Sequence, residues 1–367
     1  MRFYCNSKEL ENAINIVSKA LDSKKGIPIL EGIKIEASGS VLTLYATDLE
    51  LFIQTSINAE ILIEGEIVVP GRFISDFIKK LTAFERIEFE EIENNQLVIK
   101  SGESINQIKL IEDEFPVTES IDNDRTIEIK QSYLKELIEK SVFCVAVDGT
   151  RPVIKGCLIE VRDKQAIAVA LDGFRLAKIT KPLEKAVVEH SFIVPGKKLE
   201  DIGRIIEDND NIVKISTNDK LVTFDMGATK ITSQLIEGKF IDYNRIIPEH
   251  FETVVDVKID EFMDSLDRIS IISRTKKDKN QARFNIMENK VVIYSSSEIA
   301  QGKEIVPAKV EGKEIEIAFN ISYISAAMSR IRGDYARIAI NTNNTPARIT
   351  EIGSDESLYI VLPIRLI

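Results

Sequence analysis

Apolar residues recur at helical spacing in three stretches of the chain. In residues 10–21 they stand at i, i+3, i+4, i+7 and i+11, and similar spacing begins at Leu134 and at Phe262. Such spacing places apolar side chains on one face of an amphipathic helix. Asn6 and Glu9 are typical of a capping box at the start of the first stretch. The pattern predicts three helices in corresponding places.

A second set of helix-like stretches opens at a constant interval of 125 residues, with Val69–Arg72, Val194–Lys197 and Phe319–Ser322. The apolar positions that follow each opening stay in step. A period of this length is too long for a solenoid repeat and indicates triplication of a whole domain. The matching apolar positions are Ile74, Leu199 and Ile324, and then Leu81, Ile206 and Ile331.

Segments rich in β-branched residues lie between the helices, for example Val41–Tyr45, Ile87–Glu90 and Val291–Tyr294. Each repeat therefore reads as helix, strands, helix, strands. Polar stretches at 117–125 and 248–252 separate the repeats and are typical of compact linkers. We expect three domains, over residues 1–120, 126–248 and 252–367.

The composition indicates a soluble globular protein of 367 residues, 44% of them hydrophobic and 29% charged. No apolar run approaches the roughly 20 residues that span a bilayer. The segment Met1–Asn6 lacks the apolar core of a signal peptide. The three cysteines, Cys5, Cys144 and Cys157, have no metal-type spacing. We therefore expect a cytoplasmic protein with reduced thiols, no metal and no cofactor.

Two carboxylates, Asp48 and Asp172, are the main candidates for general acid–base or metal chemistry. They occupy equivalent positions in successive repeats, so we expect them to lie far apart and to cap turns at strand ends. His190 and His250 also lie in different repeats, beside loop-like sequence. No nucleophile, base and acid set of the Ser-His-Asp kind is available. The sequence predicts a protein that is not an enzyme.

The net charge of −11 excludes a uniformly basic surface but leaves room for one basic face. Lysine and arginine recur around the helices of every repeat, which suggests such a face. An ordinary solvated surface, with Asp76, Glu200 and Asp201 as compensating charges, stays open as the alternative. The recurring basic residues are Lys24, Lys25, Arg72, Lys79, Lys80, Lys197, Lys198, Arg204, Arg274, Lys276, Lys277, Lys279, Arg330 and Arg332.

Short motifs spread over the full length make the chain resemble one family, the β subunit of bacterial DNA polymerase III, or DNA sliding clamp. No single motif is specific, but their order within three tandem repeats is. The motifs are Ile27–Leu30, Ala46–Glu50, Val69–Arg72, Arg151–Val153, Asp172–Leu176, Val194-Pro195, Gly238–Tyr243, Phe319–Tyr323 and Leu362–Leu366.

The resemblance implies an α+β DNA-clamp fold, with three similar domains that each have two helices on an inner face and antiparallel sheets outside. Two chains would join head to tail in a ring of six domains. The ring would encircle duplex DNA without reading its sequence and act as a homodimeric processivity factor in DNA replication. Implied partners are the polymerase III α subunit, the clamp loader, other polymerases and mismatch-repair proteins, in the cytoplasm at the nucleoid, with no membrane.

The resemblance also implies three sets of site residues. Residues that would line the hole and bind DNA are Lys24, Arg72, Lys79, Lys197, Lys198, Arg204 and Lys277. A hydrophobic cleft for short Leu- and Phe-containing peptides would comprise Arg151, Ile154, Leu171, Gly173, Phe174, Arg175, Leu176, Ile241, Arg245, Ile246, Asn320, Tyr323, Ile360, Val361, Leu362, Pro363, Ile364 and Arg365. The dimer interface would include Ile271 and Ile272.

Two other classes of protein compete with the clamp. A three-domain hydrolase would use Asp48 or Asp172 and would need a catalytic cluster within one domain. A structural ring or scaffold that does not bind nucleic acid would show no dependence on a clamp loader.

Overall fold

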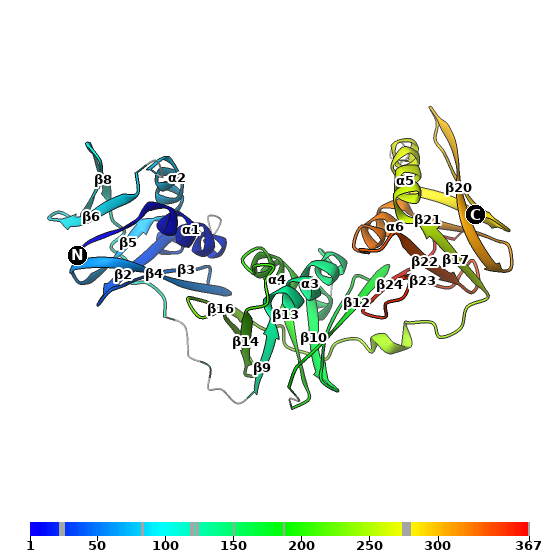
Figure 1. Ribbon diagram of the computed structural model, residues 1–367, viewed down its shortest axis with the longest axis horizontal. Helices are drawn as coiled ribbons and strands as arrows, with labels where there is room; N and C mark the ends of the chain where they lie inside the picture. Colours follow the sequence, from blue (N-terminus) through cyan, green and yellow to red (C-terminus); the bar gives the residue numbers. More distant parts are fainter. Residues whose placement is uncertain are drawn as a thin grey trace. The chain divides into compact units, whose positions relative to one another are not determined.

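The computed structural model describes residues 1–21, 26–81, 84–117, 121, 125–149, 151–185, 188–273 and 280–365 (Figure 1). These residues form two compact units. Unit 1 comprises Met1–Ser132 and Asp201–Leu235, and unit 2 comprises Tyr133–Glu200 and Ile236–Ile367. Each unit is built around one antiparallel sheet of 12 strands.

The predicted threefold repetition is confirmed, because each repeat contains eight strands and two α-helices in the same order. Repeat 1 consists of β1 (Arg2–Asn6), α1 (Ser7–Val17), β2 (Gly32–Ser38), β3 (Val41–Thr47), β4 (Leu51–Ile63), β5 (Gly65–Pro70), α2 (Gly71–Leu81), β6 (Arg86–Ile92), β7 (Gln96–Ser101) and β8 (Ser104–Lys109).

Repeat 2 consists of β9 (Arg125–Lys130), α3 (Gln131–Ser141), β10 (Gly156–Arg162), β11 (Gln165–Leu171), β12 (Arg175–Pro182), β13 (His190–Pro195), α4 (Gly196–Gly203), β14 (Ile212–Thr217), β15 (Leu221–Asp225) and β16 (Thr229–Gln234). Repeat 3 consists of β17 (Thr253–Lys258), α5 (Ile259–Ser273), β18 (Gln281–Met287), β19 (Lys290–Ser296), β20 (Gln301–Gly312), β21 (Ile315–Asn320), α6 (Ile321–Met328), β22 (Tyr335–Ile340), β23 (Ala347–Glu351) and β24 (Ser357–Val361).

The first helix of repeat 1 begins as its sequence predicts. The Asn6 side chain accepts hydrogen bonds from the backbone N–H groups of Lys8 (3.0 Å) and Glu9 (3.2 Å), which satisfies donors that the first helical turn leaves free. The predicted apolar positions from residue 10 to Val17 are buried. The helix ends at Val17, and Ser18–Ala20 forms a short 3₁₀ turn, so the helical spacing that reaches residue 21 extends beyond the helix itself.

In unit 1 the sheet passes from repeat 1 into repeat 2 without a break. The long strand β4 pairs with β16 along Leu51–Thr55 and with β1 along residues 59–63. The sheet order is β8-β7-β6-β1-β4-β16-β15-β14-β9, with β2, β3 and β5 joined beside β4. Helix α1 packs against β3 and β4 and against α2.

In unit 2 the same kind of join links repeat 2 to repeat 3, because β12 pairs with β24 along Arg175–Ile179. The order is β13-β10-β11-β12-β24-β23-β22-β17-β20-β19-β18-β21. Helix α5 packs on β17 to β20 and against α6, as the yellow and orange part of Figure 1 shows. Among the described residues, no helix is long and apolar enough to cross a membrane.

Candidate functional site

The residues predicted to form a peptide cleft all belong to unit 2 and come from distant segments of the sequence. Leu171, Leu176 and Ile360 are buried in one apolar cluster at the β11–β12–β24 join. Four other predicted residues are half-buried and pack against this cluster, so the structure brings these seven together. The four are Ile154, Ile241, Ile246 and Leu362.

Other members of this cluster were not predicted. They come from strands β10, β11, β13 and β24, from the short turn at Pro152–Lys155, and from the segment that follows β16. The continuous apolar runs in β10 and β11, which are typical of strands buried on both faces, were a usable signal for part of this set. The additional members are Leu158, Ile167, Val169, Ile193 and Tyr243, with Val153, Ile236, Phe240, Ile247 and Leu358 packed against them.

Asp172 organises the turn that presents the cleft residues between β11 and β12. Its Oδ1 accepts the backbone N–H groups of Phe174 (2.9 Å) and Arg175 (3.0 Å), and its Oδ2 accepts the Nε–H of Arg175 (2.9 Å). Gly173 between them has a φ of +91°, a conformation that favours glycine. Asp48 caps the equivalent turn of repeat 1. The prediction that both carboxylates cap strand-end turns is confirmed.

The turn places an aromatic and a cation at the edge of the cleft. The Phe174 side chain is 58% exposed and stacks on Tyr323, with ring centroids 6.3 Å apart. The Arg175 guanidinium lies 4.7 Å from the Tyr323 ring centroid and 5.4 Å from that of Phe143. Cation–π contacts of this kind hold a charged side chain in a fixed position. Much of the Phe174 surface therefore stays accessible at the edge of the predicted cleft.

The C-terminal segment completes a cavity of about 1080 Å³ beside Phe174 and Tyr323. The backbone N–H of Leu362 donates to the Phe174 carbonyl, and that of Ile364 donates to the Ala318 carbonyl, both at 2.8 Å. Asn320, Pro363 and Arg365 also line this cavity, as predicted. The prediction missed its other lining residues, which lie on β18, on β19 and at Asn280 just before β18. They are Asn280, Gln281, Arg283, Tyr294, Ser295 and Ser296.

Three of the predicted cleft residues lie apart from this arrangement. Arg151 is exposed, and Arg245 is exposed and pairs with Asp242 (2.9 Å). Neither lines the described cavity or packs on the apolar cluster. Val361 is buried in the sheet opposite Arg175 and Ala347, so it supports the cleft from within.

A charge network with Glu136, Lys140 and Lys181 buried at its centre joins repeats 2 and 3. The Glu136 carboxylate accepts from Lys140 (3.1 Å), Lys181 (2.9 Å) and Arg332 (2.8 Å), and Lys181 also donates to Glu356 (2.6 Å). Burial alone would raise the pKa of Glu136, but the hydrogen bonds from Lys181 and Lys140 outweigh it and lower the pKa. Despite its burial, the pKa of Lys181 is raised by Glu356 and Glu136.

The predicted DNA-binding residues that the structure describes lie on or beside helices. Arg72 and Lys79 are exposed on α2, and their spacing of seven residues places them on one face of that helix. On α4, Lys197 is exposed and Lys198 is half-buried. Arg204 is exposed just beyond α4 and pairs with Asp201 at 3.3 Å, so a compensating acid is present there. The other two candidates, Lys24 and Lys277, lie outside the described residues.

The predicted interface residues, Ile271 and Ile272, lie in the last turn of helix α5. Ile271 is 68% exposed. Ile272 is half-buried and packs over Gly302, where an added Cβ would collide with its Cδ1 atom. Ile271 is therefore the residue of the two that is available to a partner.

Neither a metal site nor a reactive thiol is evident in the described ranges. No group of three or more His, Cys, Asp or Glu side chains there is placed to hold a metal ion. All three cysteines are free and buried, and burial raises the pKa of each thiol.

Comparisons with known proteins give one family over almost the whole chain. Family models of the DNA polymerase III beta subunit match in its N-terminal domain (residues 1–119), central domain (128–242) and C-terminal domain (244–365). The beta sliding clamp of Staphylococcus epidermidis is 31% identical over 376 aligned residues, which cover 100% of this chain and 99% of that protein. That of Staphylococcus aureus is 31% identical and covers 96% of each chain.

Solved structures agree over the full length. The DNA polymerase sliding clamp of Bacillus subtilis has a TM-score of 0.95 at 28% identity, with 100% of both chains covered. The DNA polymerase III beta subunit of Thermotoga maritima has a TM-score of 0.93 at 30% identity and the same coverage. The chain therefore belongs to the DNA polymerase III beta subunit family, the beta sliding clamps, which are non-catalytic processivity factors with the α+β clamp fold.

Proposed function

We propose that two copies of this chain close head to tail into a ring, which encircles duplex DNA and tethers polymerase through the cleft of repeats 2 and 3. The ring acts in the cytoplasm at the nucleoid, in keeping with three free cysteines. We assign its domains to residues 1–120, 126–248 and 252–367, and the ranges of the three family models support that assignment.

The observation that carries the ring is a repeated strand pairing. The fourth strand of repeat 1 pairs with the eighth strand of repeat 2, and the fourth strand of repeat 2 pairs with the eighth strand of repeat 3. The two joins have the same register: Gln54 lies opposite Lys230, and the equivalent Lys178 lies opposite Leu358. One rule therefore connects each repeat to the next.

The same rule leaves one strand edge open at each end of the chain. Within the described ranges, β8 pairs only with β7, and residues 301–307 of β20 pair only with β19. These are the eighth strand of repeat 1 and the fourth strand of repeat 3. Open edges are templates for pairing with another chain. Pairing β20 of one copy with β8 of the other closes a ring by symmetry.

The register of the closing pair follows from the internal equivalences. In each repeat, one row of directly paired residues runs across neighbouring strands. It begins at the residue three positions before the first helix and ends on the eighth strand. In each repeat, the turn between the third and fourth strands is closed by one residue pair, and Phe52, Leu176 and Gln301 are the fourth-strand members of these pairs. Two residues further along the fourth strand, Gln54, Lys178 and Lys303 are therefore equivalent. Ile105 should therefore lie opposite the partner's Lys303. The rows are Tyr4–Glu88–Lys100–Ile105, Glu128–Lys214–Asp225–Lys230 and Asp256–Arg337–Thr350–Leu358.

Helix contacts support the same closure. In unit 2, Tyr323 on α6 and Phe143 just beyond α3 both contact the Arg175 guanidinium. Counted from the helix starts, the equivalent positions are Phe73 on α2 and Ile271 on α5. Phe73 is 50% exposed and Ile271 is 68% exposed. Two apolar side chains left uncovered at equivalent positions suit a contact between copies.

A pair of cysteines tests the closure. We expect Ile105→Cys with Lys303→Cys to form a disulfide between two chains, because directly opposed residues have Cβ atoms about 4.5–5.5 Å apart. The control is Ile105→Cys with Lys309→Cys, since Lys309 lies in the half of β20 that pairs with β17. Equal cross-linking of both pairs, or none in a dimer of confirmed mass, would contradict the register. The native cysteines are buried and do not compete.

The basic helices and the cleft complete the proposed function. Arg72, Lys79, Lys197, Lys198 and Arg204 would face the hole and contact phosphates, together with Lys24 and Lys277, and such contacts carry no sequence information. The cleft would take short peptides with Leu and Phe anchors from polymerase III α subunit, the clamp loader, other polymerases and mismatch-repair proteins. Each buried anchor contributes about 1.5–3 kcal/mol, less the ordering cost of the peptide, which gives about micromolar affinity.

A further inference from the structure

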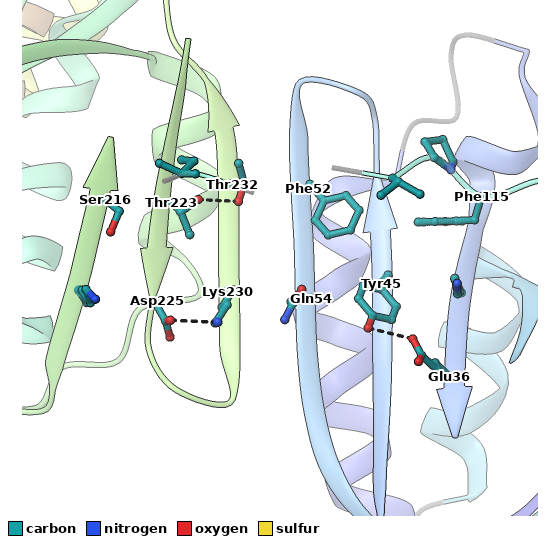
Figure 2. A pocket seen from close by; sticks show the side chains of 15 residues that line it. Glu36, Tyr45, Phe52, Gln54, Phe115, Ser216, Thr223, Asp225, Lys230 and Thr232 are labelled. Atoms are coloured by element: carbon teal, nitrogen blue, oxygen red, sulfur yellow. Dashed lines mark hydrogen bonds and ion pairs between the residues drawn. The ribbon is translucent and has the colours of Figure 1, made fainter. Parts of the chain in front are cut away.

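A second groove, with a cavity of about 640 Å³, lies at the join of repeats 1 and 2 within unit 1 (Figure 2). Its floor is one face of the continuous sheet, formed by β2 to β4 of repeat 1 and β14 to β16 of repeat 2. Phe115, in the segment that follows β8, forms part of its wall.

This groove occupies the same place in the repeat pattern as the peptide cleft. Phe52 lies opposite Thr232 across the β4–β16 join, as Leu176 lies opposite Ile360 across the β12–β24 join. Phe115 packs on a small apolar cluster of repeat 1, as Phe240 packs on the cluster beneath the cleft. The two grooves are thus two copies of one architectural feature.

Their chemistry differs. The positions held by Leu358 and Ile360 at the cleft are Lys230 and Thr232 in this groove. The row of directly paired residues that crosses the floor of the groove consists of polar and charged side chains, not aliphatic ones. A peptide with only Leu and Phe anchors would leave these groups unsatisfied. In order across the sheet, the row is Tyr45, Gln54, Lys230, Asp225 and Lys214.

One end of the groove is aromatic. The Tyr45 and Phe52 rings lie 6.0 Å apart at an angle of 50°, and Phe115 lines the same cavity. The Tyr45 hydroxyl donates to Glu36 at 3.1 Å. Burial and that carboxylate raise the pKa of Tyr45 to about 12, so the hydroxyl stays protonated and uncharged at neutral pH. The three rings suit an aromatic side chain.

The other end is basic. Lys230 pairs with Asp225 at 3.2 Å. Lys214 is exposed and makes no ion pair or hydrogen bond with any residue that the structure describes. Asp225 and Glu128 flank Lys214 on the neighbouring strands, but each already interacts with another group. Lys214 is therefore the cation of this groove that is left for a ligand carboxylate.

We propose that this groove binds a short extended peptide that carries one aromatic and one acidic side chain about four residues apart. Because the groove is assigned by its equivalence to the peptide cleft, the inference rests on the proposed function. Strand β4, with Phe52, and strand β14, with Lys214, are separated by three strand spacings, or about 14 Å. Four residues of extended peptide span about 13 Å.

Two acetylated, amidated pentapeptides of opposite direction serve as probes: Phe-Ser-Thr-Ser-Glu and Glu-Ser-Thr-Ser-Phe. We expect at least one of them to bind the full-length dimer, and Lys214→Glu to weaken that binding at least tenfold in a titration followed by NMR. Lys220→Glu is the matched control, because Lys220 is exposed on the β14–β15 turn, outside the groove, and undergoes the same charge change. It should change affinity less than twofold.

Replacing the peptide Glu by Gln should also weaken binding to the wild type, but by less than Lys214→Glu does, because it removes an attraction without adding a repulsion. Equal weakening by the two lysine variants, or no binding of either probe at millimolar concentration, would overturn the proposal. So would displacement of the probe by Gln-Leu-Ser-Leu-Phe, since that peptide is designed for the cleft. If Gln-Leu-Ser-Leu-Phe does not bind the protein at all but the acidic probe binds in a Lys214-dependent way, the result contradicts the proposed cleft and supports the proposed groove.

Discussion

Glu136 is the residue on which most charge converges in unit 2, and its contribution to stability should depend on pH. Its carboxylate contacts three cations and has a lowered pKa in the folded state. A carboxyl of this kind stabilises the fold above its ordinary pKa of 4.5, and that stabilisation is lost as pH falls through the folded value.

We expect Glu136→Gln to lower the free energy of unfolding by about 3 kcal/mol at pH 7, because buried Lys140 loses its carboxylate partner and buried Lys181 loses one of its two, keeping Glu356. Glu311→Gln, which removes an exposed partner of Lys309, should lower it far less, because solvent screens exposed ion pairs. Urea unfolding at pH 7 and at pH 3 measures both differences. A cost for Glu136→Gln that is equally large at pH 3 would contradict the charge interaction.

Asp172 and Asp48 offer a matched pair of substitutions, because both cap the same turn in different repeats. Each substitution to Ala should cost about 1–3 kcal/mol of stability through lost hydrogen bonds. Only Asp172→Ala should weaken binding of Gln-Leu-Ser-Leu-Phe, by about tenfold, since it frees Phe174 and Arg175. Fluorescence polarisation with a labelled peptide tests this. Similar affinities for the two variants would show that the turn does not position the cleft.

In the C-terminal segment after β24, the backbone and the side chains have different roles. Its backbone bonds to Phe174 on repeat 2 and to Ala318 on repeat 3, while its side chains line the cleft cavity. Because β24 ends at Val361, the sheet does not need this segment. We expect deletion of Leu362–Ile367 to abolish peptide binding and to leave the dimer mass unchanged. Undiminished affinity would place the cleft elsewhere.

The element scale also shows what the sequence could predict. Periodicity predicted the helices and the repeats, because it reports which side chains face a core. It did not predict a strand before each first helix, since those strands have only five or six residues.

For the candidate site, the predicted apolar residues do meet, but five lining residues on β18 and β19, and Asn280 just before β18, were missed. Charge partners such as Glu136 and Lys181 were missed as well, since pairing across elements leaves no local pattern in the sequence. Likewise, the recurrence of lysine and arginine predicted basic helices. It did not predict which of these basic side chains already form an ion pair with an acidic residue, as Arg204 does with Asp201.

At the scale of the whole molecule, the ring depends on the contact between copies. We expect Ile271→Asp to yield a folded monomer of 41.3 kDa by light scattering, because it would place a charge in the proposed apolar contact with Phe73 of the partner subunit. Val147→Asp is the control, since Val147 is 87% exposed and lies outside the proposed interface. A dimer that survives Ile271→Asp would remove this residue from the interface.

Encirclement should also separate two kinds of DNA binding. Affinity from phosphate contacts falls by about 0.9 log unit per log unit of salt for each phosphate neutralised. A ring threaded on closed circular DNA is held by topology instead. Retention on circles should therefore persist at salt that removes the protein from short linear duplex, and cutting the circle should release it. Equal salt loss on both substrates would contradict encirclement.

The strand rule that joins the repeats makes no distinction between a neighbour in the same polypeptide and one in another. Strand β4 meets β16, and β12 meets β24, by hydrogen bonds that do not require a covalent link between the repeats. The linkers of the chain therefore determine how many polypeptides are needed, and the bend at each join determines how many repeats complete a turn. A single repeat thus already contains both strand edges that assembly uses, and a covalent link between repeats only reduces the number of separate chains.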